Sequence, residues 1–189
     1  MLILITGGSG SGKSAFAEQK LLEIASEQGK NCIYLATMSR GEDGESAARI
    51  RRHRALRAGK GFGTVEQPLR LDEAKIPDGS AGLREDLSNL LANEIYLPGG
   101  QLAIKERTEE QLAEAVLGPV LALAERASVL VVGTNEIFSD GVLYDEETEA
   151  FRKDLAILNR AIASRADAVY EVVAGIPLIM KEMQTERDR

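Results

Sequence analysis

The hydrophobic pattern along the chain predicts strands that alternate with helices. Short apolar runs rich in β-branched residues, which are typical of buried strands, occupy residues 2–5, 32–36 and 128–132. Longer stretches place their apolar residues three or four positions apart, the spacing of a helix that packs on one side: residues 15–26, 45–58, 87–96, 108–127 and 145–166. This alternation is typical of an α/β fold in which helices flank a sheet.

The remaining segments carry weaker patterns. They predict an extended segment at residues 62–68, a short helix at 69–76, a turn at 77–80, loops at 96–107 and 137–144, and a hairpin around Gly175 made of residues 168–174 and 176–180. Residues 81–86 should hold the next strand by position, although the stretch is poorly apolar and Arg84 interrupts it. Thr108 fits the start of a capping box, and Asp145 is expected to cap the last helix.

The first apolar run, residues 2–5, leads directly into a loop with the sequence GGSGSGKS, which ends in Lys13 and Ser14. The loop fits the phosphate-binding pattern G-x-x-x-x-G-K-[ST], whose glycines let main-chain N–H groups face a phosphate at the start of a helix. Lys13 would place a cation on the β- and γ-phosphates, and the Ser14 hydroxyl would ligate Mg²⁺. A flexible Gly/Ser linker has the same composition, but here a strand and a helix flank the loop as the motif requires. The loop therefore predicts a nucleoside triphosphate site without identifying the reaction.

Composition limits the classes of protein that remain. The length of 189 residues and the hydrophobic content of 44% suit one α/β domain, expected to span residues 1–189. The net charge of −7 argues against broad nucleic-acid binding, and a single Cys and a single His exclude an internal disulfide and a Cys/His metal site. No signal peptide and no apolar run of membrane-spanning length is evident, so a cytoplasmic protein without a membrane span is expected.

The only histidine, His53, lies in a basic stretch at residues 49–57. One interpretation is structural: a partly buried helix histidine beside Ile50 and Leu56, with the arginines on a solvated face. The other is catalytic, because a neutral imidazole can attack phosphorus near neutral pH while guanidinium groups stabilise the charge of the transferring group. The residues alone do not decide between the two interpretations.

Short motifs follow one another in a specific order over nearly the whole chain. They are the phosphate loop at residues 6–14, Ala-Thr-Met at 36–38, Ala-Arg-Ile at 48–50 with His-Arg at 53–54 and Arg57, Glu-x-Pro at 66–68, Leu-x-Glu at 83–85, Ser-Asn-Leu-x-Ala-Asn-Glu at 88–94, Thr-Asn-Glu at 134–136 and Val-Val-Ala-Gly-Ile-Pro at 172–177. This set resembles the family of bifunctional adenosylcobinamide kinase/adenosylcobinamide-phosphate guanylyltransferases of cobalamin synthesis. The chain departs from that family at residues 83–86, where the family usually has an apolar strand end and a small residue after the acid.

The resemblance implies two reactions. In the first, the terminal phosphate of ATP or GTP goes to the hydroxyl of the aminopropanol arm of adenosylcobinamide. In the second, GTP gives GMP to a histidine of the enzyme, and the GMP then passes to adenosylcobinamide phosphate, which yields adenosylcobinamide-GDP. Pyrophosphate is the other product. The resemblance also implies a P-loop, RecA-like, mostly parallel sheet flanked by helices, Mg²⁺ on the triphosphate, and a homotrimer.

The family's functional positions carry over onto matching positions of this sequence. His53 takes the place of the nucleophile that carries GMP, and Lys13 that of the catalytic lysine. The nucleotide-contacting positions are Gly7, Gly8, Ser9, Gly10, Ser11, Gly12, Lys13, Ser14, Ala36, Thr37, Met38, Arg54, Ala55, Leu56, Arg57, Glu66 and Glu85. Ser14 and Glu85 would hold Mg²⁺, Glu85 directly or through water, with Asp86 as a competing carboxylate.

Two rival functions stay open. One is a small-molecule P-loop kinase without guanylyltransferase activity, in which His53 is structural. The other is a non-enzymatic, nucleotide-dependent switch, which would need a partner surface that the sequence does not clearly show. The loop at residues 96–107 is compatible with covering a substrate or with reaching a neighbouring subunit.

Overall fold

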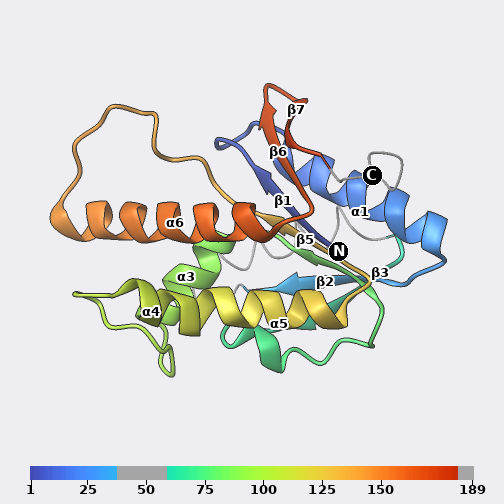
Figure 1. Cartoon of the computed structure of the whole chain (residues 1–189), viewed down its shortest axis with the longest axis horizontal. Helices are drawn as coiled ribbons and strands as arrows, with labels where there is room; N and C mark the ends of the chain where they lie inside the picture. Colours follow the sequence, from blue (N-terminus) through green and yellow to red (C-terminus); the bar gives the residue numbers. More distant parts are fainter. Residues whose placement is uncertain (38–58, 183–189) are drawn as a thin grey trace.

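The computed structural model describes residues 1–37 and 59–182, whose strands form one seven-stranded sheet (Figure 1). The strands are β1 (Leu2–Thr6), β2 (Cys32–Ala36), β3 (Phe62–Glu66), β4 (Ala81–Arg84), β5 (Val129–Gly133), β6 (Ala168–Val173) and β7 (Ile176–Lys181). Their order across the sheet is β3-β2-β4-β5-β1-β6-β7. All neighbouring strands are parallel except β6 and β7, which form an antiparallel hairpin. The expected mostly parallel sheet with a C-terminal hairpin is therefore confirmed.

Helices cover both faces of the sheet (Figure 1). They are α1 (Lys13–Gln28), α3 (Leu87–Tyr96), α4 (Glu109–Leu112), α5 (Gly118–Arg126) and α6 (Glu146–Arg165), together with the single turns η1 (Leu71–Glu73) and η2 (Ala113–Leu117). Helix α1 covers one face, and α3, α5 and α6 cover the other. Within the described ranges, no helix combines the length and the apolar character needed to cross a membrane.

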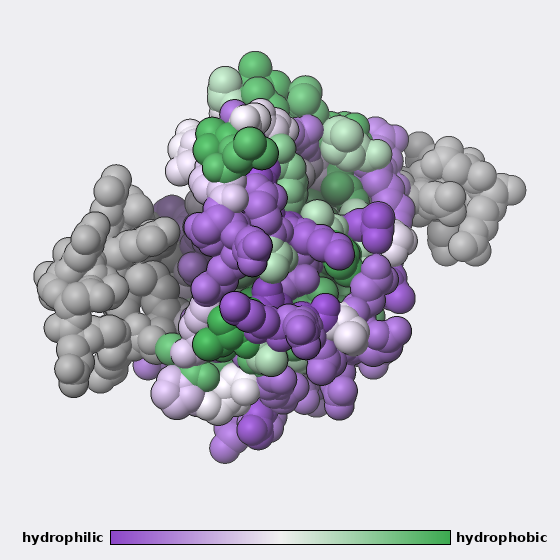
Figure 2. Space-filling model, turned by 90° about the vertical axis from the view of Figure 1, so that its left-hand side faces the viewer, coloured by the Kyte–Doolittle hydropathy of each residue, from purple (hydrophilic) through white to green (hydrophobic). Residues whose placement is uncertain are grey.

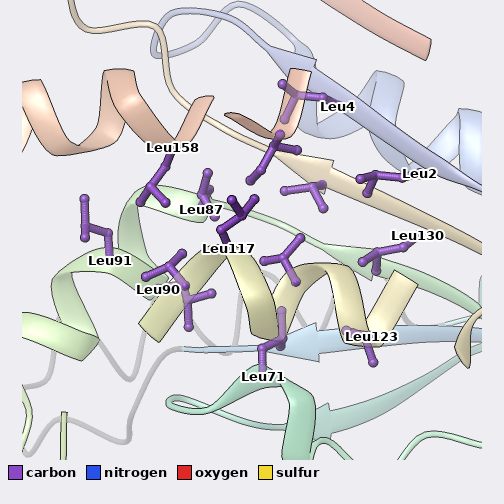
Figure 3. Packing of buried hydrophobic residues seen from close by; sticks show 14 of the residues in the cluster. Leu2, Leu4, Leu71, Leu87, Leu90, Leu91, Leu117, Leu123, Leu130 and Leu158 are labelled. Atoms are coloured by element: carbon purple, nitrogen blue, oxygen red, sulfur yellow. The ribbon is translucent and has the colours of Figure 1, made fainter. Parts of the chain in front are cut away.

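The alternation of side chains along β1 divides the core into two layers. Ile3 and Ile5 point to the α1 face and join a buried cluster with Leu21. Leu2 and Leu4 point the other way and join a larger cluster, whose leucines fill the space between the sheet and helices α3, α5 and α6 (Figure 3). Because β1 is buried on both faces, its sequence is continuously apolar rather than alternating.

The helix expected at residues 108–127 forms as three consecutive pieces, α4, η2 and α5. Thr108 caps it through the predicted capping box. In η2 the helix widens to a π-helical turn, and the Gly118 N–H donates to the carbonyl of Ala113. Pro119 follows at once; it has no N–H to donate, and its ring crowds the carbonyl four residues earlier in a regular helix. The wider turn therefore lies where the proline interrupts regular hydrogen bonding.

The helix expected at residues 69–76 is shorter than predicted, because only Leu71–Glu73 form a helical turn. Side chains from elsewhere satisfy the carbonyls of this segment. Gln67 donates to the carbonyl of Leu69 at 2.7 Å, and Arg126 donates to those of Asp72 and Ala74 at 3.0 and 3.1 Å. The predicted length was wrong because these side-chain donors, Gln67 nearby and Arg126 from α5, replace the bonds of a continued helix. The helix expected at residues 45–58 lies outside the described residues.

Candidate nucleotide-binding site

The parallel strands bring their carboxyl ends to one edge of the sheet, and the loop after β1 lies at this edge. Gly12 has a φ of 92°, in the left-handed region that favours glycine. A Cβ atom on Gly7 would lie 2.6 Å from both the Ser11 Oγ and the Val172 carbonyl oxygen. The first and last glycines of the motif are therefore required by the shape of the loop itself, before any ligand is considered.

Positive charge gathers at this loop. Helix α1 begins at Lys13, and no acidic residue occupies its first turn, so the positive end of the helix dipole is not opposed there. The Lys13 Nζ donates to the carbonyl of Gly8 at 3.3 Å, which folds the ammonium group back over the loop. Such a loop at a helix N-terminus is suited to binding phosphate groups.

Main-chain hydrogen bonds from segments that follow two neighbouring strands hold the loop. The Gly175 N–H, in the turn between β6 and β7, donates to the carbonyl of Ser11 at 2.8 Å. From the chain that follows β5, the Glu136 N–H donates to the carbonyl of Gly7 at 3.1 Å. The two motifs expected at residues 134–136 and 172–177 thus both contact the phosphate loop.

The turn after β4 carries two adjacent carboxylates with different surroundings. Glu85 Oε2 accepts a hydrogen bond from the Tyr34 hydroxyl at 3.1 Å, and Tyr34 packs on the α1 face of the sheet. The Asp86 Oδ1 accepts from the Ser88 N–H at 3.1 Å and from the Asn135 Nδ2 at 2.9 Å. Asp86 therefore caps helix α3, and its carboxylate is engaged in holding that helix.

Arg84 is buried directly beneath this turn. Its side chain is fully buried, and burial lowers the pKa of the guanidinium to about 10, while Asp86, Tyr34 and Glu85 act in the opposite direction. The group is therefore charged at neutral pH. The strand expected at residues 81–86 is confirmed as β4 despite this charge, because β2 and β5 pair with it on both sides.

Helix α3 also reaches the ends of β2 and β3. The Asn93 Nδ2 donates to the carbonyl of Thr37 at 2.7 Å and to that of Pro68 at 3.0 Å. Ala36 and Glu66 are register partners at the last position of β2 and β3. Asn93 thus holds the chain where it leaves β2 and again where it leaves β3.

The family model described as cobinamide kinase / cobinamide phosphate guanyltransferase matches residues 3–180. The chain belongs to this family. It is 32% identical over 188 residues to the bifunctional adenosylcobalamin biosynthesis protein CobU of Escherichia coli, with 96% of this chain and 100% of that protein covered. It is 33% identical over 181 residues to the bifunctional adenosylcobalamin biosynthesis protein CobP of Pseudomonas aeruginosa, with 94% and 96% covered. Among solved structures, the KaiC-like protein PH0186 of Pyrococcus horikoshii aligns with 98% of this chain and 80% of its own at 16% identity and a TM-score of 0.48.

In this member of the family, the described candidate residues lie at the ends of four parallel strands. The residues of the phosphate loop follow β1, Ala36 and Thr37 lie at the end of β2, Glu66 ends β3, and Glu85 follows β4. The candidates Met38, His53, Arg54, Ala55, Leu56 and Arg57 lie outside the described residues.

Residue chemistry alone assigned no role to several polar side chains that shape this edge. Tyr34, Asn93 and Asn135 donate to carbonyls or carboxylates of other segments, and Arg84 donates to the carbonyls of the two residues that follow it. Asn135 lies in the polar run at residues 134–136, directly after a buried strand, and this run is also one of the motifs that carry the family resemblance. Within the described ranges, no group of three or more His, Cys, Asp or Glu side chains could hold a metal. A nucleotide-bound Mg²⁺ needs no such group, because phosphate oxygens and water supply most of its ligands.

Proposed function

We propose that the protein phosphorylates adenosylcobinamide and then transfers GMP to the product. The observation that carries the proposal is a complete phosphate loop between β1 and α1 in a chain whose family is named for both activities. The two curated relatives are both called bifunctional adenosylcobalamin biosynthesis proteins, and their names support the same pair of activities.

In the kinase step, the phosphate loop holds the triphosphate of ATP or GTP. Main-chain N–H groups and the Lys13 ammonium bind the β- and γ-phosphates. The oxygen of the substrate hydroxyl attacks the γ-phosphorus and the hydroxyl proton is released, while the bond from the γ-phosphorus to the bridging oxygen breaks and the nucleoside diphosphate leaves. Bound Mg²⁺ would neutralise charge on the phosphates.

Ser14 and Glu85 are the residues proposed to hold that Mg²⁺. A hydroxyl and a carboxylate are the hard oxygen ligands that the ion prefers. Ser14 lies in the first turn of α1, and Tyr34 binds the Glu85 carboxylate from the same face of the sheet. Asp86 is a poorer candidate, because its carboxylate caps α3 and binds Asn135. Glu85 binds the ion directly or through water.

In the guanylyltransferase step, the proposed nucleophile is His53. An imidazole nitrogen attacks the α-phosphorus of GTP, the bond to the β-phosphate breaks, and pyrophosphate leaves. A phosphate oxygen of adenosylcobinamide phosphate then attacks the same phosphorus, and the P–N bond breaks. The products are adenosylcobinamide-GDP and the free histidine. The arginines at positions 54 and 57 would stabilise negative charge on the transferring group.

The experiment that tests the proposal is labelling of the protein with α-³²P-GTP and Mg²⁺. We expect label that survives denaturation in alkali and is lost in acid, as a phosphoramidate requires, and that is absent in His53→Ala. GTP labelled at the γ-phosphate should leave no label on the protein. Label that persists in His53→Ala would contradict the assignment of the nucleophile.

A second assay follows the γ-phosphate of ATP or GTP to adenosylcobinamide. Lys13→Met should abolish this transfer, since it removes the cation at the phosphates. Phosphate transfer without any protein label would indicate a kinase that lacks guanylyltransferase activity. Tight nucleotide binding with neither label nor transfer would indicate a switch.

We also propose that the protein is a homotrimer, as the family resemblance implies. Edge strand β7 offers a surface for such an assembly, because Ile176, Leu178, Ile179 and Met180 are each between 46% and 63% exposed. Figure 2 shows hydrophobic residues gathered at the top of the face that it views, the end of the molecule at which both the β6–β7 turn and the loop before α6 lie in Figure 1. Apolar surface of this kind commonly marks a contact between proteins. Sedimentation equilibrium should give three times the mass of the chain, and a monomer or dimer would contradict the proposal.

A further inference from the structure

Arg84 is the largest of the fully buried side chains in the described part of the protein. It ends the central strand β4, where its register partners are Leu35 of β2 and Val132 of β5. Both partners belong to the apolar cluster on the face opposite α1. A guanidinium group in such surroundings is costly unless it is paired and hydrogen-bonded.

The hydrogen bonds of Arg84 go to the turn that follows it. The Nη1 donates to the carbonyl of Glu85 at 2.5 Å, and the Nη2 donates to the carbonyl of Asp86 at 3.0 Å. The Nε has no hydrogen-bond partner within the described residues. An apolar side chain would fill the same site without burying an unpaired N–H, so packing alone does not account for an arginine here.

The turn needs such support for two reasons. Asp86 has a φ of 73°, in the left-handed region that is unfavourable for a residue with a Cβ atom. Glu85 and Asp86 are also two consecutive acidic residues, next to the site proposed for a triphosphate. The guanidinium lies on the opposite side of the strand end and supplies the compensating positive charge.

Glu85 is thereby held at its main chain and at its side chain. Arg84 binds its carbonyl from one face of the sheet, and Tyr34 binds its carboxylate from the other. The capping contact of Asp86 with Ser88 fixes the next residue of the turn. Rotation of the Glu85 carboxylate away from the α1 face would break the contact with Tyr34, and a shift of the Glu85 main chain would break the contact with Arg84.

We propose that Arg84 is a positioning residue that fixes the turn after β4, so that Glu85 presents its carboxylate to the nucleotide-bound Mg²⁺. The inference rests on the metal role of Glu85 in the proposed function and goes beyond it by assigning the buried arginine. Outer-shell groups of this kind typically change metal affinity by about 10- to 100-fold when they are removed.

The test measures binding of a fluorescent GTP analogue in Mg²⁺ and in excess EDTA, so it needs neither the corrinoid substrate nor His53. The wild-type protein should bind more tightly in Mg²⁺. We call the ratio of the affinity in Mg²⁺ to the affinity in EDTA the Mg²⁺ gain. Glu85→Gln and Arg84→Met should each lower this Mg²⁺ gain by about tenfold or more, while the affinity in EDTA changes less than about twofold. Arg84→Lys keeps the charge but cannot form the two-pronged contact, and its Mg²⁺ gain should fall between those of wild type and Arg84→Met.

Arg126→Met is the matched control. Arg126 also donates to main-chain carbonyls, those of Asp72 and Ala74. It ends α5 shortly before β5 begins, so it lies at the amino ends of the strands, away from the proposed site. This variant should keep the full Mg²⁺ gain even where urea unfolding shows lost stability.

Three outcomes would overturn the assignment of Arg84. One is a full Mg²⁺ gain in folded Arg84→Met, and another is a Mg²⁺ gain in Arg84→Lys as low as in Glu85→Gln although both are folded. The third is equal loss of affinity in Mg²⁺ and EDTA, which a purely structural role would produce. If Glu85→Gln keeps its Mg²⁺ gain, the metal role of Glu85 is wrong and the inference fails with it. The transfer reactions and the His53 label are measured independently of all these results.

Discussion

At the scale of single residues, the glycines of the phosphate loop differ in what they contribute. A Cβ atom on Gly7 would meet the Val172 carbonyl oxygen at 2.6 Å, and this is a main-chain atom that cannot turn away. A Cβ atom on Gly8 would meet nothing within 4 Å. The same motif therefore contains one glycine that the protein's own packing demands and one that packing leaves free.

This difference predicts that Gly7→Ala destabilises the protein even without nucleotide. Overpacking against β6 should lower the free energy of unfolding by about 1–3 kcal/mol, whereas Gly8→Ala should change it by about 0.5 kcal/mol or less. Urea unfolding of both nucleotide-free variants measures the two values. Equal losses would show that the loop adjusts to the added methyl group and that glycine at position 7 serves the ligand alone.

At the scale of elements, helix α3 links three strand ends. Its N-terminus is capped by Asp86 after β4, and Asn93 on a later turn binds the carbonyls of Thr37 and Pro68 after β2 and β3. The apolar side of the same helix packs into the core through Leu87, Leu90 and Leu91 (Figure 3). Burial of that side therefore fixes where the polar side holds the loops.

We expect Asn93→Ala to leave two carbonyls without this donor and to lower the free energy of unfolding by about 1–3 kcal/mol. Residues 38–58 begin directly after Thr37, so the rate of protein labelling by α-³²P-GTP should also fall by about tenfold or more, as for other small misplacements near a reacting group. Asn89→Ala on the same helix is the control, since the side-chain hydrogen bonds to the carbonyls of Thr37 and Pro68 come from Asn93. Unfolding in urea and the initial labelling rate give the two readouts. Equal effects of both variants would refute the role of Asn93.

The elements also show what a linear pattern can and cannot predict. The apolar runs located β1, β2 and β5, and the cap at Thr108 was correct because capping depends on residues close in sequence. The pattern was least informative at β4, where a buried arginine replaces an apolar side chain. Pairing with strands on both sides makes this segment a strand, and that pairing joins residues far apart in the chain.

The same distinction applies to the candidate site. The phosphate loop could be predicted because its atoms act from one continuous segment with a fixed spacing. Asn93 and Asn135 could not be assigned from residue chemistry, because their partners, the carbonyl of Thr37 and the carboxylate of Asp86, are 56 and 49 positions away. Their roles depend on which strand ends the sheet brings together.

At the scale of the whole molecule, a buried ion pair joins the segment before α4 to helix α6. The Arg107 Nε lies 2.5 Å from the Asp154 Oδ2, and the two side chains are 1% and 7% exposed. Arg107 also donates to the carbonyl of Ala103 at 3.0 Å. The end of the loop expected at residues 96–107 is therefore fixed to its own subunit.

We expect Asp154→Ala to lower the free energy of unfolding by about 3–5 kcal/mol, because the Arg107 guanidinium would remain buried without a partner. The double variant Arg107→Met/Asp154→Leu removes both charges and keeps apolar volume, so it should recover most of this loss. Urea unfolding of Arg107→Met, Asp154→Leu and the double variant, each against the wild type, forms a cycle that isolates the coupling between the residues. Strictly additive losses would mean that the charges contribute independently and that this contact does not hold the loop to α6. If the double variant recovers its stability but binds adenosylcobinamide more weakly, the fixed position of the loop also serves substrate binding.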